Sequence, residues 1–61
     1  MPRMIEGKLE RISGWVYDVK KRIYKKMEIE VLLDDGTRRR EWLEGDLREL
    51  VGKRVCLDYG E

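Results

Sequence analysis

The sequence predicts an all-β fold, a small barrel of five strands formed by a single domain that spans residues 1–61. The first observation behind this prediction is the alternation of apolar and polar side chains in most segments, which is typical of half-buried strands. The second is that the chain contains no alanine, the residue that favours helices most strongly. The third is its length, because 61 residues support only one hydrophobic core.

The first predicted strand covers residues 4–12 and contains a β-bulge. Its apolar face is formed by Ile5, Gly7 and Leu9. The alternation slips before Ile12, which predicts a bulge at residues 10–11 that would bend the strand. The pair Ser13-Gly14 is typical of a turn and would end this strand.

The second predicted strand covers residues 15–19, a run of aromatic and β-branched side chains. Trp15 and Tyr17 alternate with Val16, so only one of these two sets can face the core. If Val16 faces inward, the two rings form an exposed aromatic pair of the kind that nucleic-acid-binding barrels present. If the rings face inward, the pair is structural, and the sequence leaves both arrangements open.

Residues 23–33 and 37–43 predict a β-hairpin whose turn ends in Gly36. Charge selects its register. A two-residue loop would place Glu30 opposite another glutamate, which is a repulsive cross-strand pair. A three-residue loop, with Gly36 in the left-handed conformation, places Glu30 opposite Arg40 instead. The second register is the predicted one.

Residues 44–53 predict the one helical stretch of the chain. Asp46 can cap it, and Gly52 ends it. The apolar side chains on one face of this short helix would be Leu47, Leu50 and Val51. Residues 54–59 then predict the fifth strand.

One helical turn directly before the last of five strands is the order found in SH3-like barrels. An OB-like barrel is the alternative, since an OB fold usually carries its helix between the third and fourth strands. Residues 29–36, Ile-Glu-Val-Leu-Leu-Asp-Asp-Gly, resemble the hairpin of small SH3-like and OB-like RNA-binding barrels, including the initiation-factor type. The chain after this hairpin departs from the initiation-factor pattern, so the resemblance implies no particular binding residue.

The side chains that catalysis requires are nearly absent. The sequence has no histidine, one cysteine, one serine (Ser13), one threonine (Thr37) and no glycine-rich phosphate loop. One cysteine without histidine cannot supply the four ligands of a structural zinc site. The expected protein is therefore not an enzyme and has no cofactor, no metal and no small-molecule substrate. Cys56 is expected to be either a small buried filler or an interface residue.

Composition also suggests where the protein works. Charged residues make up 44% of the chain, while asparagine and glutamine are absent, which is typical of proteins from hot environments. There is no apolar run near the roughly 20 residues that a membrane span needs. The N-terminus also lacks the apolar core of a signal peptide. We therefore expect a cytoplasmic location and no membrane partner.

The candidate binding surface combines cations with aromatic rings. Five cations lie within seven residues around Tyr24, and they are Lys20, Lys21, Arg22, Lys25 and Lys26. Arg38, Arg40 and Trp42 share one face of the fourth predicted strand. Cations neutralise phosphates and rings stack on bases. With Trp15 or Tyr17 added, these side chains predict RNA or DNA binding of low sequence specificity.

The alternative is a protein-interaction or structural module, in the form of a homodimer. An open edge strand or the face with Trp15 and Tyr17 would then pair with a second copy. The formal net charge of only +1 favours this alternative, because dedicated nucleic-acid-binding domains are usually more basic. The charge is unevenly distributed, however, with a balance of +5 over residues 1–26 and −4 over residues 27–61.

Overall fold

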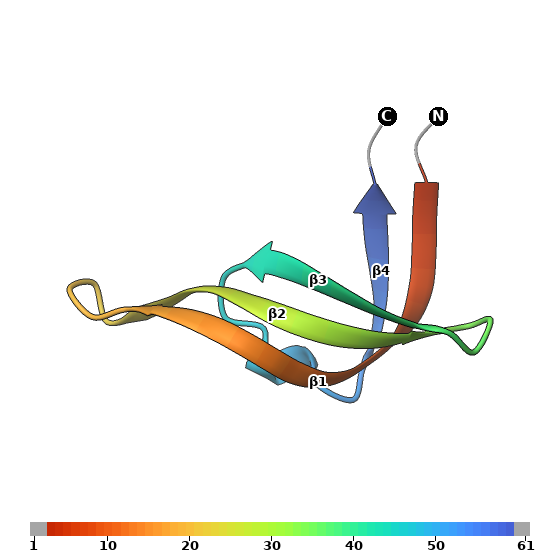
Figure 1. The fold of residues 1–61 in the computed structure, drawn as a ribbon, viewed down its shortest axis with the longest axis horizontal. Coiled ribbons are helices and arrows are strands. Elements are labelled where there is room, and N and C mark those ends of the chain that lie inside the picture. The colour runs from red at the N-terminus through yellow and green to blue at the C-terminus, as the bar shows by residue number, and fades with distance from the viewer. Residues whose placement is uncertain (1–2, 60–61) are drawn as a thin grey trace.

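The computed structural model describes residues 3–59, except for the side chain of Tyr59, and shows an antiparallel sheet curled into a half-barrel (Figure 1). The sheet has four strands in the order β3-β2-β1-β4. Their bounds, with those of the single 3-10 turn η1, are β1 Arg3–Asp18, β2 Ile23–Leu33, β3 Arg38–Glu44, η1 Arg48–Leu50 and β4 Arg54–Tyr59. The all-β prediction is confirmed.

Strand β1 is one long, bent strand where the sequence predicts two. Its N-terminal part pairs with β4, and the rest pairs with β2 (Figure 1). The bulge predicted at residues 10–11 is confirmed, because the register with β2 shifts between Leu9 and Arg11. The predicted turn at Ser13-Gly14 is wrong. Ser13 is the extra residue of a second bulge, and Gly14 remains in the ladder opposite Glu28.

The predicted register of the β2–β3 hairpin is confirmed. Glu30 lies directly opposite Arg40, and Gly36 has a φ of +92°, the left-handed conformation that the three-residue loop requires. The backbone N–H of Leu33 donates to the carbonyl oxygen of Thr37 at 2.7 Å and closes the loop. Opposite charges on one face therefore predicted a register that turn type alone left open.

The predicted helix over residues 44–53 is reduced to the three residues of η1. Its two ends are tied to the sheet, because the N–H of Gly45 donates to the carbonyl of Lys25 and that of Gly52 donates to Leu9. Between these two hydrogen bonds only Arg48–Leu50 takes up a helical conformation. Asp46 does not cap η1 as expected, since η1 has no side-chain cap, but its carboxylate accepts the N–H of Arg48.

The core lies under the bend of β1 and is covered by the segment around η1. Its fully packed side chains are Leu9, Ile29, Val31 and Leu57. Of the three apolar side chains expected to face inward from the predicted helix, Leu47 packs against this core. Leu50 and Val51 are exposed at 38% and 42%. The β1–β2 hairpin extends beyond the core, and there its inner face is left uncovered. Within residues 3–59, no helix has the length and apolar character to cross a membrane.

A surface ion pair connects the β2–β3 turn to the start of β4. The guanidinium of Arg54 donates to both carboxylate oxygens of Asp34, at 2.8 and 3.1 Å, and to Glu6 at 3.3 Å. The hydrogen bond from Arg54 holds the pKa of Asp34 below its ordinary value of 3.8. Hydrogen bonds from Thr37 and Arg48 likewise lower the pKa values of Asp35 and Asp46.

These lowered pKa values predict that acid destabilises the protein. A carboxylate with a folded pKa below its unfolded pKa stabilises the fold above about pH 4, and this contribution is lost as the pH falls through the folded value. We expect the thermal unfolding midpoint of the wild-type protein to decrease once the pH is lowered beyond about 4. In Asp34→Asn the decrease over the same pH range should be smaller. Circular dichroism melts between about pH 2.5 and 6 measure both slopes. Equal slopes for the two proteins would show that the Asp34–Arg54 pair does not contribute.

Candidate nucleic-acid interface

The pairing of β1 with β2 decides which side chains face inward. Directly paired residues of antiparallel strands share a face, and Trp15 pairs with the buried Met27. Tyr17 pairs with Tyr24, one bulge further along the hairpin. Both rings of β1 therefore lie on the inner face, beyond the end of the core, whereas Val16 lies on the outer face. They are nevertheless largely uncovered, with 61% of Trp15 and 45% of Tyr17 exposed.

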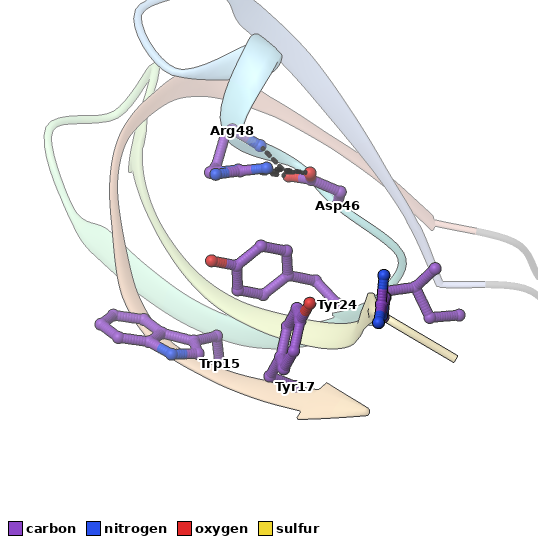
Figure 2. Close-up of a pocket in the computed structure, with 7 residues that line it drawn as sticks. Trp15, Tyr17, Tyr24, Asp46 and Arg48 are labelled. Carbon is purple, nitrogen blue, oxygen red and sulfur yellow. Dashed lines mark hydrogen bonds and ion pairs between the residues drawn. The ribbon is translucent and has the colours of Figure 1, made fainter. Parts of the chain in front are cut away.

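These rings line an open hollow at the uncovered end of the half-barrel (Figure 2). It has a volume of about 780 Å³, and its lining residues are Trp15, Tyr17, Arg22, Ile23, Tyr24, Asp46 and Arg48. The rings of Tyr17 and Tyr24 meet edge to face, with their centroids 4.9 Å apart. This contact holds two aromatic side chains in place while leaving ring surface open to the hollow.

Arg48 forms the far wall of the hollow and was not among the predicted binding residues. Its guanidinium carbon lies 4.5 Å from the centroid of the Tyr24 ring. Three hydrogen bonds, of 2.7, 3.0 and 3.2 Å, join its side chain to the carboxylate of Asp46 and fix its orientation (Figure 2). The sequence pattern missed both residues because it assigned them to a helix. A predicted helix does not indicate that Asp46 and Arg48 lie beside the rings of the β1–β2 hairpin.

A second, smaller hollow adjoins the first and is almost entirely apolar. It has a volume of about 180 Å³ and is lined by Ile12, Trp15, Tyr24, Met27 and Arg48. Trp15, Tyr24 and Arg48 are common to both hollows. Met27 is held in place because its sulfur accepts the backbone N–H of Leu47 at 3.3 Å.

The predicted basic loop is confirmed as the tip of the β1–β2 hairpin, next to the larger hollow. Lys20, Lys21 and Arg22 are exposed there, and Arg22 lines the hollow itself. The N–H of Lys21 donates to Asp18 at 3.0 Å, and Arg22 has a left-handed φ of 57°, so the backbone of the tip is folded tightly. Lys25 is the extra residue of a bulge in β2, and it is exposed close to this tip.

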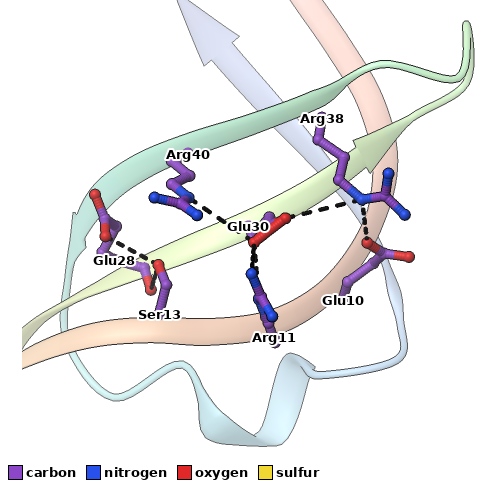
Figure 3. Close-up of polar contacts among 7 residues, drawn as sticks. All are labelled: Glu10, Arg11, Ser13, Glu28, Glu30, Arg38 and Arg40. Carbon is purple, nitrogen blue, oxygen red and sulfur yellow. Dashed lines mark hydrogen bonds and ion pairs between the residues drawn. The ribbon is translucent and has the colours of Figure 1, made fainter.

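The remaining predicted residues lie on the outer face of the sheet. The ammonium group of Lys26 is 5.5 Å from the centroid of the Trp42 ring, and this ring covers Gly14 of β1. Arg38 and Arg40 surround Glu30 together with Arg11 (Figure 3). The structure therefore does not place the Arg38–Arg40–Trp42 stripe beside Trp15, Tyr17 and Tyr24.

Two other expectations from the sequence can be compared with the structure. Cys56 is exposed on β4, so its alternative role as a buried filler is wrong. No cluster of three potential metal-binding side chains occurs among the described residues. Comparisons of the chain with protein-family models, with curated proteins and with solved structures gave no match.

Proposed function

We propose that the protein is a non-enzymatic module that binds RNA or DNA with low sequence specificity, through the inner face of the β1–β2 hairpin. The observation that carries the proposal is the joint placement of three rings and two arginines around one hollow beside a basic tip. Rings offer stacking surfaces to bases, and the cations neutralise phosphates and release their counterions.

In this proposal Lys20 and Lys21 contact the phosphate backbone on the approach to the hollow. Arg22 contributes charge at its rim, and Lys25 adds charge next to the tip. The charge of Arg48 is paired with Asp46, so Arg48 contributes the planar surface that it holds against the Tyr24 ring. The outer-face residues Arg38, Arg40 and Trp42 do not belong to the proposed site, because the first two are engaged with Glu30 and the third covers Gly14. We further propose that the half-barrel is an open relative of the SH3-like barrels, which the position of η1 before β4 supports.

The basic tip gives the first test of this proposal. We expect Lys20→Ala/Lys21→Ala to weaken binding of a fluorescent 15-nucleotide single strand by about tenfold at low salt. It should also make the plot of log association constant against log salt concentration less steep, by about 1.4 in slope. Each phosphate contact contributes about 0.7 through the counterions that it releases from a single strand, and this variant loses two such contacts. Fluorescence anisotropy across a salt series measures both quantities for RNA and for DNA.

A matched control removes two exposed lysines elsewhere, in Lys8→Ala/Lys53→Ala. This variant has the same net charge as the first one, and we expect it to retain most of the affinity. Equal losses in both variants would indicate a response to net charge alone, which contradicts a site at the hairpin tip. The absence of any salt-sensitive binding by the wild-type protein would overturn the proposed function.

Self-association is the second candidate function, and two observations favour it. The structure exposes 4899 Å² of surface, whereas a compact monomer of its mass exposes roughly 4,200 Å². This excess is close to the roughly 800 Å² that one partner covers in a standard interface. The edges of the described sheet, β3 and β4, are also open to a further strand. The same titration separates the candidates, because a purely self-associating protein would not bind the strands in a salt-dependent way.

A further inference from the structure

We infer that the apolar hollow between Trp15 and Tyr24 receives one unpaired nucleobase, so that the protein selects single strands over duplex. This inference rests on the proposed function and adds the part of the ligand that enters the fold. It depends on the size of the hollow, on its lining and on its position beside the larger, charged hollow.

The size of the hollow suits one flat ring system. A buried apolar cavity of about 150 Å³ is large enough to bind benzene, and this hollow has a volume of about 180 Å³. Ile12 and Met27 supply an aliphatic and a thioether surface, and Met27 is itself buried. Of the described residues in this lining, Arg48 is the one that is charged, so a phosphate would exchange most of its water for a single charged partner that Asp46 already holds. A lysine ammonium group would meet a like charge.

The walls of the hollow are those that stacked bases prefer. Unstacked bases bind between aromatic side chains and planar guanidinium groups. Trp15 and Tyr24 supply the rings, and Arg48 lies against the Tyr24 ring with its guanidinium held by Asp46. A base in this position would contact groups that are already oriented before binding, which reduces the entropy lost in forming the complex.

The surrounding charges place the rest of the strand outside the hollow. The larger hollow shares Trp15, Tyr24 and Arg48 with the apolar one and extends to Arg22 at the hairpin tip. A strand whose base enters between the rings therefore has cations available for its neighbouring phosphates. A base within a duplex is paired and stacked, and it must first be extruded at a cost in free energy. Unpaired strands are consequently the preferred ligand.

Three ligands, compared at equal concentrations of phosphate, test this inference: a 12-nucleotide oligodeoxyadenylate, an abasic strand of the same length, and a 12-base-pair duplex. The Trp42→Phe variant serves as the host, because Trp15 is then its only tryptophan. We expect the base-bearing strand to bind roughly tenfold more tightly than the abasic strand and to quench Trp15. The duplex should bind no better than the abasic strand.

Each outcome distinguishes the inference from the function on which it rests. Equal, salt-sensitive binding of all three ligands would overturn the base-binding hollow while leaving nucleic-acid binding in place. In that case a side chain of a protein partner would be a better candidate than a nucleobase for the ligand of the apolar hollow. If none of the three ligands binds, and an RNA strand of the same length also fails to bind, both the hollow and the proposed function are overturned.

Two substitutions on opposite faces locate the effect. Trp15→Ala removes one wall of the hollow. Because Trp15 is largely exposed, we expect the variant protein to fold, and circular dichroism checks this. We expect this variant to bind base-bearing and abasic strands equally. Trp42→Ala on the outer face should keep the roughly tenfold preference of the wild-type protein for the base-bearing strand. The reverse pattern would place base recognition on the outer face and contradict the inference.

Discussion

Gly7→Ala is expected to remove a large part of the protein's stability. Gly7 pairs on one side with Leu33 of β2 and on the other with Val55 of β4, at the bend of β1. A Cβ atom at this position would overlap the carbonyl oxygen of Leu32 and lie 2.9 Å from the Cα of Leu33. Both of these are backbone atoms in the central part of the sheet, so no rotamer change relieves the overlap.

The size of the effect follows from comparing the strain with the total stability. Forcing an extra carbon into a packed position costs about 1–3 kcal/mol, and backbone atoms yield less readily than side chains, so we expect about 3 kcal/mol. A chain of 61 residues has a free energy of unfolding of only about 3–9 kcal/mol in total. Urea denaturation followed by circular dichroism measures the loss through the shift in midpoint.

Gly14→Ala is the matched control, because Gly14 is also a glycine of β1 that lies close to a neighbour. Its added Cβ would lie 3.2 Å from the ring atom Cη2 of Trp42, which is the end of a half-exposed side chain and can move. We expect a change in the free energy of unfolding of no more than about 1 kcal/mol. A similar loss in both variants would show that β2 does not approach β1 as closely at Gly7 as the structure indicates.

The parts of the fold that could be predicted are those where one periodic pattern runs without interruption. Strand β2 alternates over residues 26–33, and its buried apolar members are Met27, Ile29 and Val31, as the pattern indicates. The cross-strand charge pair Glu30–Arg40 then determined the register of β3. Each of these inferences uses only residues that are neighbours in the sequence or directly opposite each other in a hairpin, and both relations can be read from one sequence.

The number of strands could not be predicted, because a bulge and a turn interrupt the alternation in the same way. Ser13-Gly14 has the composition of a turn, but the hydroxyl of Ser13 donates to the backbone and side chain of Glu28. These hydrogen bonds to the partner strand keep β1 continuous across the bulge. They involve residues 15 positions apart, so no local pattern contains them.

The candidate site was predictable in composition but not in arrangement. The aromatic residues and the cations were identified, yet each bulge exchanges the two faces of a strand. Bulges near Glu10, Ser13 and Lys25 therefore decide that Trp15, Tyr17 and Tyr24 share the inner face. Arg48 and Asp46 were not predicted as site residues for a similar reason. They belong to the segment after β3, and the sequence does not show that this segment lies beside the β1–β2 hairpin.

Glu30→Gln is expected to have the second large effect on stability. Glu30 is 7% exposed, yet it faces outward from the sheet and is covered by the arginines around it (Figure 3). Its carboxylate lies 2.7 Å from the guanidinium of Arg11 and 3.8 Å from those of Arg38 and Arg40. The substitution preserves the shape of the side chain but leaves three like charges around a neutral amide.

The magnitude depends on how far solvent screens these charges. Breaking a buried ion pair costs about 3–5 kcal/mol, but the arginine side chains are about 60% exposed, which reduces the penalty. We therefore expect Glu30→Gln to lose about 2 kcal/mol of unfolding free energy at low ionic strength. Part of this loss should be recovered in about 1 M salt, where repulsion among the arginines is screened within about 3 Å.

Glu10→Gln provides the comparison, since within residues 3–59 Glu10 forms an ion pair with one arginine, Arg38, at 2.9 Å, and its side chain is 31% exposed. This variant should lose less than about 1 kcal/mol, as surface ion pairs usually do. If Glu30→Gln is no more destabilised than Glu10→Gln and does not recover in salt, the arginines do not depend on Glu30 to remain close together. Arg40 would then be available to a phosphate on the outer face, and its exclusion from the proposed site would have to be withdrawn, whereas Arg38 would still be paired with Glu10.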